Sequence, residues 1–497
     1  MKNRKSRSGI KKTNRNIIRV IYFFSFLFFG MIGYMVYFIG WRSDDLMGNA
    51  YNPRMEVFNE RFVRGAIISS DGQVLARTVV SDTRKNSDGT ENPSGAYKEI
   101  REYPFGKTFA QAIGYSTKGK TGIESLANFY LMESNSNPVI QVVNEITETK
   151  SQGDNVITTL DAELQKIAYE ALGEHNGAVI AVNPKTGEVL AMASRPSFDP
   201  NTIVEDWDSI VNAENTDGPL VNRCTQGLYA PGSTFKIVMA LEYMREHPND
   251  YQNFTFNCDG EYRDASNSDY VVHCYSGEVH GTEDLHTAFA YSCNSAFAKI
   301  GTMVNKTKLA ETAEQLLFNQ ELPVAIASSK SRFSVTEESG TWTMMQTAIG
   351  QGETMMSPLH EVILASAIAN KGVLQEPKLL KQVQSSDGKV IKVFEDSAEQ
   401  TLMTETEASV LASFMRSVVT DGTASKLRDA DYAAAGKTGS AEVSKNGEII
   451  TNAWFTGFAP YDDPEIAVCV VVEEGETGGR TAVPVAKQVF DYWLNER

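Results

Sequence analysis

Ser233 and Lys236 lie three residues apart, directly after Pro231 and Gly232. The Pro-Gly pair interrupts the chain, and the apolar run 237–241 favours a buried helix, so we expect Ser233 in the first turn of that helix. Residues i and i+3 share a helix face, where an amine with a lowered pKa can take the proton of a hydroxyl. The free N–H groups at the helix start would stabilise negative charge on an attacked carbonyl. This spacing therefore predicts a nucleophilic serine with a lysine base.

Ser292 and Asn294 form a second candidate motif. Residues 282–284 are typical of a helix start, and we expect that helix to break near Tyr291 before another begins around Ala296. On such a connection a hydroxyl can relay a proton to a leaving amine, while an amide holds a substrate backbone. Ser-x-Asn is also a frequent turn or cap sequence, so the functional interpretation depends on the other motifs.

A third motif runs from Lys437 through Thr438 and Gly439 to Ser440, ahead of an Asn-Gly hairpin signal at 446–447. We expect an edge strand of an antiparallel sheet. Lys437, Thr438 and Ser440 would offer a cation and two hydroxyls to a carboxylate, and Gly439 would let a substrate backbone approach closely. The N–H of Ser440 would complete an oxyanion hole with that of the nucleophilic serine.

The three motifs, in this order, resemble those of the class B penicillin-binding proteins, which are membrane-anchored D,D-transpeptidases of peptidoglycan. The similarity also covers short segments that resemble pedestal and transpeptidase signatures, to which we assign no catalytic role: 64–67, 71–72, 101–104, 113–115, 122–124, 196–201, 222–223 and 350–352.

The resemblance implies that Ser233 attacks the penultimate D-Ala carbonyl of a stem peptide, with Lys236 as the base. Ser292 would pass the proton to the leaving D-Ala, and the amine of a neighbouring stem peptide would then accept the acyl group. β-Lactam antibiotics should acylate the same serine. The resemblance brings no cofactor and no metal, and it implies a membrane glycan polymerase as a partner.

The expected fold class is α+β, with a transmembrane helix, an elongated mixed pedestal domain and a transpeptidase domain built on a five-stranded antiparallel sheet flanked by helices. A helix is expected over 160–172, a hairpin over 177–193, two further strands over 449–458 and 466–473, and a last helix from Ala482 to Trp493. A charged stretch over 82–97 should be mobile, and no accessory domain is expected after the last helix. The expected divisions are a basic tail 1–19, an anchor 20–41, a pedestal 42–155 and a transpeptidase domain 156–497.

Residues 20–41 carry no charge and are long enough to cross a bilayer as a helix. The eight cations and no acids before them place the N-terminus in the cytoplasm and the rest of the chain outside the cell. A cleaved signal peptide ending near 48–50 is the alternative, but the apolar stretch is longer than such segments usually are.

Residues 1–42 hold nine cations and no acids, so the rest of the chain has a formal charge of −26 when the total is −17. A chain without a basic stripe argues against a nucleic-acid partner.

The chain has five cysteines, so at least one is unpaired. Cys258 and Cys274 flank a polar segment shaped like a hairpin loop, and we expect a disulfide there outside the cell. A zinc site is the alternative, because one stretch of sequence gathers His273, Cys274, His280 and His286, although the spacings match no standard finger. Cys293 and Cys469 are expected to be small buried side chains.

Three other functions share the motifs or the anchor. A β-lactamase would need a base that activates a deacylating water. Glu442 is the acid nearest the third motif, but we expect it to have a structural role. A β-lactam-sensing receptor usually has several membrane segments and a cytoplasmic effector. A scaffold for a glycan polymerase would not need intact motifs.

Overall fold

We analysed a computed structural model of the chain, which describes residues 3–38, 62–82, 97–135, 144, 146, 149–212, 218–395, 398–445 and 447–497. The first unit holds helix α1 (Asn3–Tyr37), and residues 17–37 of that helix are long and apolar enough to cross a membrane. This agrees with the predicted N-terminal apolar helix, although residues 39–41 of the predicted span lie outside the described residues. The stretch 83–96, predicted to be mobile, and the turn residue 446 lie outside them too.

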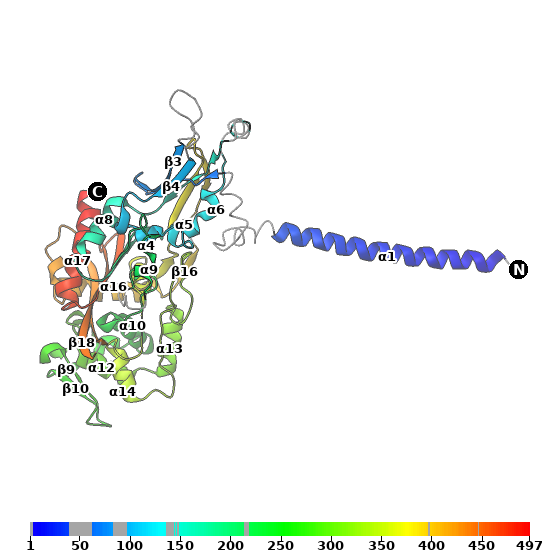
Figure 1. The fold of residues 1–497 in the computed structure, drawn as a ribbon. Helices are drawn as coiled ribbons and strands as arrows, with labels where there is room; N and C mark the ends of the chain where they lie inside the picture. Colours follow the sequence, from blue (N-terminus) through cyan, green and yellow to red (C-terminus); the bar gives the residue numbers. More distant parts are fainter. Residues whose placement is uncertain are drawn as a thin grey trace. The chain divides into compact units, whose positions relative to one another are not determined.

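The second unit, Phe58–Arg497, contains the predicted five-stranded antiparallel sheet. Its strands lie in the spatial order β17, β18, β19, β7, β8. Strand β18 of this sheet is labelled and drawn in orange in Figure 1. The third motif is on β17, at the sheet edge, as predicted. The bounds are β7 (Gly177–Val182), β8 (Val189–Arg195), β17 (Ala435–Lys445), β18 (Glu448–Ala459) and β19 (Ile466–Val472).

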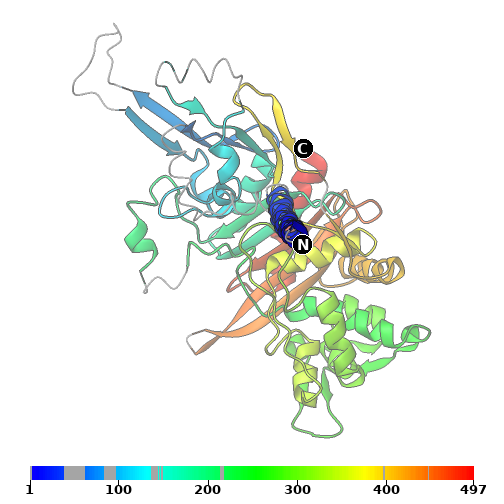
Figure 2. The same cartoon turned by 90° about the vertical axis from the view of Figure 1, so that its right-hand side faces the viewer.

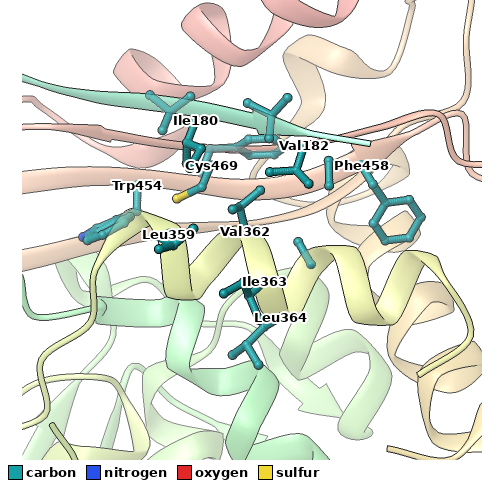
Figure 3. Packing of buried hydrophobic residues seen from close by; sticks show 14 of the residues in the cluster. Ile180, Val182, Leu359, Val362, Ile363, Leu364, Trp454, Phe458 and Cys469 are labelled. Carbon is teal, nitrogen blue, oxygen red and sulfur yellow. The ribbon is translucent and has the colours of Figure 1, made fainter. Parts of the chain in front are cut away.

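Both faces of this sheet are covered by helices, so its inner strands are almost continuously apolar. Helix α15 (Pro358–Ala369) packs on one face, where Leu359 and Val362 meet the side chains of the strands (Figure 3). Ser357 caps this helix by accepting the N–H of His360, and every helix residue except Ala369 is buried. The other face carries α8 (Ala162–Ala171) and α17 (Val483–Asp491), which confirm the helix predicted over 160–172 and the predicted last helix.

A second lobe holds the helices that carry or support the first two motifs. It is the green region at the bottom of Figure 2. Helices α10 and α12 pack together, and α12 also packs on α14. The lobe includes α10 (Lys236–Glu246), α11 (Leu285–Ala290), α12 (Asn294–Met303), α13 (Lys306–Gln315) and α14 (Thr341–Ala348), and α16 (Glu405–Thr420) joins it to the sheet.

Two small hairpin-like sheets stand beside α12 in this lobe. The pairs are antiparallel: β9 (Phe256–Cys258) with β12 (Gly281–Glu283), and β10 (Glu261–Arg263) with β11 (Val271–His273). The pairing of β9 with β12 brings together segments that are more than twenty residues apart in sequence.

A six-stranded mixed sheet, the pedestal sheet, occupies the other end of the unit, in the order β15, β14, β6, β2, β3, β4. Strand β6 lies across the predicted division at 155/156, and β14 and β15 come from the region assigned to the transpeptidase domain. The division therefore stays a prediction. The bounds are β2 (Ile67–Ile68), β3 (Val74–Asp82), β4 (Tyr97–Glu102), β6 (Asn155–Thr158), β14 (Leu380–Gln384) and β15 (Val390–Val393).

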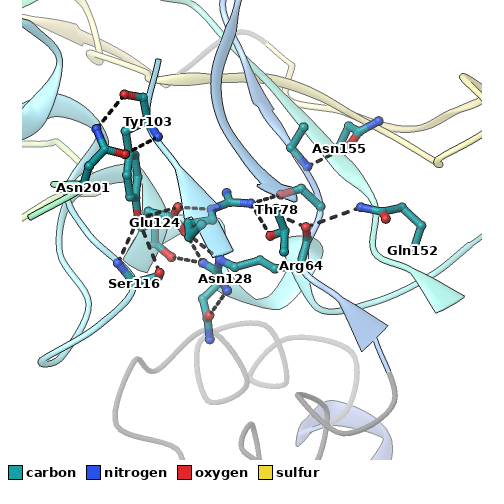
Figure 4. Close-up of polar contacts among 12 residues, drawn as sticks. Arg64, Thr78, Tyr103, Ser116, Glu124, Asn128, Gln152, Asn155 and Asn201 are labelled. Atoms are coloured by element: carbon teal, nitrogen blue, oxygen red, sulfur yellow. Dashed lines mark hydrogen bonds and ion pairs between the residues drawn. The ribbon is translucent and has the colours of Figure 1, made fainter. Parts of the chain in front are cut away.

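A buried ionic network supports this end of the unit (Figure 4). Glu124, on α5 (Gly122–Leu126), is fully buried and pairs with Arg64 at 2.7 Å and with Arg101 at 2.8 Å. Burial alone would raise the pKa of Glu124, but Arg101 and Arg64 hold it at about 2. The signature segments at 64, 101 and 124 thus meet in one structural cluster.

The remaining described α-helices and strands are short. They are β1 (Phe62–Val63), β5 (Ser151–Gln152), α4 (Ala110–Ile113), α6 (Asn128–Leu131), α9 (Trp207–Ile210), β13 (Val373–Gln375) and β16 (Glu399–Thr401).

Candidate active site

Ser233 lies in a tight 3₁₀ turn, Gly232–Phe235, that leads directly into α10. The predicted helix start is therefore present, although its first turn is 3₁₀ rather than α-helical. Gly232 has φ of +56°, and its N–H donates to the Gly350 carbonyl at 2.9 Å. Ser233 itself is partly buried and lines a cleft. The backbone on either side of Ser233 is thus fixed, by the Gly232 hydrogen bond before it and by α10 after it, and the Ser233 side chain lines the cleft.

Lys236 is fully buried one turn along. Its Nζ donates to the Ser292 carbonyl at 2.6 Å, to Asn294 Oδ1 at 2.8 Å and to Ser292 Oγ at 3.2 Å. Burial lowers the pKa of Lys236 to about 8, and nearby groups including Cys293 only partly oppose this effect. A useful fraction of this amine is therefore neutral near neutral pH.

Lys437 contacts Ser292 from strand β17 of the sheet. Its Nζ is buried and donates to Ser292 Oγ at 2.9 Å and to its neighbour's carbonyl, Thr438 O, at 3.1 Å. Burial and the charge of Lys236 hold the pKa of Lys437 well below its usual range. Because a hydroxyl oxygen accepts two hydrogen bonds, the two lysines can use both lone pairs of Ser292 and leave its proton to another group.

The turn that carries Ser292 is well defined. Helix α11 is capped by Asp284 and ends before Ser292, whose φ is +60°, and Cys293 caps α12. Asn294 is engaged at both ends of its amide, because its Nδ2 also donates to the His273 carbonyl at 3.1 Å. The predicted connection between two helices is therefore present, with Asn294 tied to Lys236.

Strand β17 runs against the Ser233 turn with almost no side chain between them. A Cβ added at Gly439 would lie 2.8 Å from the Pro231 carbonyl, and one at Gly232 would lie 2.8 Å from the Ser440 carbonyl. Glycine at both positions allows this close approach. The backbones of Ser233 and Ser440 are thus neighbours, as an oxyanion hole built from their N–H groups requires.

The hydroxyls of the third motif have further partners. Thr438 Oγ1 bonds to Thr423 Oγ1 at 2.5 Å, and Ser440 Oγ accepts the N–H of Gly478 at 3.2 Å. The sequence reasoning missed both partners, since Thr423 lies in a turn after α16 and Gly478 begins the short helical segment Gly478–Ala482, and neither shows a pattern of its own.

The cleft has a volume of about 1000 Å³. Ser233, Ser292, Asn294, Thr438 and Ser440 all line it, whereas the two lysines lie buried beneath its floor. The structure therefore brings the three predicted motifs together in one site. The side chain of Glu442 lies exposed at the cleft margin.

Glu361 is a second group that the sequence reasoning missed. It is buried in α15 and bonds to Thr234 Oγ1, next to the nucleophile candidate, at 2.5 Å. Burial raises the pKa of Glu361 to about 7. The available signal was an acid within an otherwise apolar helix.

Cys258 and Cys274 do meet, but the structure has both thiols free with their sulfurs 3.7 Å apart. A disulfide requires about 2.05 Å. The expected bond is therefore absent from this structure, because Cys274 Sγ also lies 3.7 Å from Cys293 Sγ and is shared between them. His280 Nδ1 completes the group, 3.4 Å from Cys258 Sγ. We call this the Cys₃His cluster: Cys258, Cys274, His280 and Cys293.

Two family models match the chain. The penicillin binding protein transpeptidase domain matches residues 177–491, and the penicillin binding protein A dimerisation domain matches residues 64–156.

Individual proteins are similar over most of the chain. Peptidoglycan D,D-transpeptidase PbpA of Mycolicibacterium smegmatis is 27% identical over 482 residues, which cover 91% of this chain and 94% of that protein. Peptidoglycan D,D-transpeptidase MrdA of Acinetobacter baumannii is 28% identical, with 80% of this chain aligned to 66% of MrdA. The solved D,D-transpeptidase domain of a peptidoglycan glycosyltransferase from Eggerthella lenta superposes with a TM-score of 0.73 at 28% identity, covering 87% of this chain and 99% of that one.

Proposed function

Because this chain belongs to the penicillin-binding protein transpeptidase family and is a peptidoglycan D,D-transpeptidase, we propose that Ser233 is its acylated nucleophile. The observation that carries the assignment is the convergence of two buried, pKa-lowered lysines on Ser292 beside that serine. Lysines whose pKa values are strongly lowered by burial cluster at functional sites.

In the first half-reaction, neutral Lys236 takes the proton of Ser233 Oγ, which attacks the penultimate D-Ala carbonyl of a stem peptide. The N–H groups of Ser233 and Ser440 stabilise the oxyanion. Ser292, whose lone pairs face the two lysines, gives its proton to the nitrogen of the departing D-Ala and takes up the proton held by Lys236, which becomes neutral again. A serine ester remains, and the amine of a second stem peptide resolves it to form the cross-link.

The third motif would hold the substrate carboxylate. Thr438 and Ser440 supply hydroxyls at the cleft wall, and Lys437 supplies positive potential from below. Asn294 keeps the Lys236 amine in place, which is a narrower role than the substrate contact we expected from sequence. β-Lactams would occupy the same cleft and acylate Ser233.

We also infer that the catalytic unit lies outside the cell, because the basic residues before the apolar helix favour a cytoplasmic N-terminus. A membrane glycan polymerase as partner stays a prediction from the family resemblance.

The direct test is labelling with a fluorescent penicillin followed by peptide mapping. The label should appear on the peptide that contains Ser233, and Ser233→Ala should abolish it. Ser209→Ala, which changes an exposed serine that does not line the cleft, is the control and should label normally. Label retained by Ser233→Ala would refute the assignment.

A further inference from the structure

The Cys₃His cluster has the geometry of a metal site. Its four ligand atoms all lie within 4.8 Å of one another, and three neighbouring pairs are 3.4 to 3.7 Å apart. Zn²⁺ binds thiolates at about 2.3 Å and imidazole nitrogen at about 2.0 to 2.1 Å. A tetrahedron with those bond lengths has edges of about 3.5 to 3.8 Å, which is close to the distances of these three neighbouring pairs.

The surroundings of His280 support the same ligand. Its Nδ1 faces the sulfurs, while its Nε2 lies 3.8 Å from a carboxylate oxygen of Glu278. Metal-bound histidines commonly place their second nitrogen against a carboxylate, which orients the ring and raises its basicity. Three soft thiolates with one imidazole are typical of a closed structural zinc site rather than of a calcium or magnesium site.

The cluster joins four separate pieces of backbone. Cys258 ends β9, Cys274 follows β11, and His280 precedes β12, which pairs with β9. Cys293, the fourth ligand, caps α12. Each of these strands has only three residues, so the small sheets gain little stability from their own hydrogen bonds. A metal ion would supply the missing constraint.

Cys293 also stands between Ser292 and Asn294, the two residues of the second motif. The carbonyl of His273, adjacent to Cys274, accepts a hydrogen bond from Asn294 at 3.1 Å. The cluster therefore contacts the turn that carries Ser292 and Asn294 at two points, the side chain of Cys293 and the backbone carbonyl of His273.

We propose that the Cys₃His cluster binds one Zn²⁺, and that this zinc fixes the turn carrying Ser292 and Asn294. The binding step stands alone, while the positioning effect rests on the proposed function. The ion takes no part in the acyl transfer.

Metal analysis of the purified full-length chain tests the binding step. The wild type should hold about one zinc per chain, with X-ray absorption showing three sulfurs at about 2.3 Å and one nitrogen at about 2.0 Å. Co²⁺ in place of Zn²⁺ should give thiolate charge-transfer bands. Ser233→Ala should bind zinc equally, so that a failure of the proposed nucleophile is distinguishable from a failure of this site.

Variants then identify the ligands. Cys274→Ser and Cys293→Ser should lose zinc, whereas Cys224→Ser should keep it. Cys224 is a matched control because it is equally buried, and it donates to backbone carbonyls as a serine hydroxyl can. Since a ligand variant could fail to fold, Glu278→Gln adds a milder test. It leaves all four ligands in place and should weaken zinc binding about tenfold.

The positioning effect is measured as the rate of acylation by a fluorescent penicillin. Removing zinc with a chelator should slow acylation, and adding Zn²⁺ back should restore it in the wild type and in Cys224→Ser. Undiminished acylation of metal-free protein would overturn the positioning role. A wild-type chain that takes up no zinc after reconstitution, or a native Cys258–Cys274 disulfide found by mass mapping, would overturn the site itself.

Discussion

The lowered pKa of Lys236 makes the rate of acylation depend on pH. If neutral Lys236 takes the proton of Ser233, the rate is proportional to the fraction of chains in which this amine is deprotonated. Deprotonation increases with pH, so the rate should rise with pH up to the pKa of Lys236 and then stay constant.

The size of the effect follows from the burial of the lysine. A fall of the pKa from 10.5 to about 8 favours the neutral amine by about 3 kcal/mol. At pH 7 roughly one chain in ten would carry neutral Lys236, compared with roughly one in 3,000 for an ordinary lysine. The rate should therefore increase about tenfold per pH unit below pH 8 and level off above it.

The assay is the second-order rate constant for acylation by a fluorescent penicillin, measured from initial rates across this range. Lys236→Arg is the matched control, since a guanidinium keeps the positive charge but does not deprotonate in proteins. Its profile should be low and flat. A wild-type rate that is already constant between pH 6 and 8, or that keeps rising towards pH 10, would refute Lys236 as the buried base.

Four further outcomes are expected. Glu124→Gln should lower the free energy of unfolding by about 3 to 5 kcal/mol because it leaves two arginines without their buried partner, while Glu102→Gln, in an exposed pair, should cost under about 1 kcal/mol in the same denaturant titration. Since the pKa of Glu124 is lowered from 4.5 to about 2, its ionisation stabilises the fold above pH 4.5, and thermal melts should show this contribution disappearing as pH falls towards 2; a melt independent of pH there would contradict the pairing. Thr423→Val should slow acylation about tenfold through the loss of the bond that orients Thr438, and an unchanged rate would show that this bond is dispensable. The penicilloyl ester on Ser233 should last many minutes in mass spectrometry after removal of free drug, which corresponds to a barrier above roughly 21 kcal/mol, and release within a second would instead indicate a β-lactamase.

Local patterns in the sequence predicted most of the catalytic unit. Continuous apolar runs predicted the inner strands of the sheet, such as β7 and β19, because a sheet that is covered on both faces needs such segments. The helix start at residues 282–284 and the break near Tyr291 could be predicted because capping chemistry depends on adjacent residues. The three motifs could be placed on their elements for the same reason.

Features that depend on distant pairing were not predictable in this way. Nothing in the sequence of β14 indicates that it pairs with β6 on one side and with β15 on the other, and the extent of β6 across position 155 is set by its pairing with β14. The cysteines show the same limit. The spacing suggested a bond between Cys258 and Cys274. Cys293 Sγ lies as close to Cys274 Sγ as Cys258 Sγ does, and this proximity arises only when α12 packs against the small sheets.

The pairing of β6 with β14 also has a consequence for synthesis of the chain. Thr159 at the end of β6 bonds to the Lys378 carbonyl across 219 residues. At ordinary translation rates of about 5 to 20 residues per second, one edge of β6 waits roughly 10 to 45 seconds before its neighbour has been made. The pedestal sheet is therefore completed only after the serine turn and the second motif have been synthesised, and any nascent chain stopped before residue 380 presents an open strand edge to other chains.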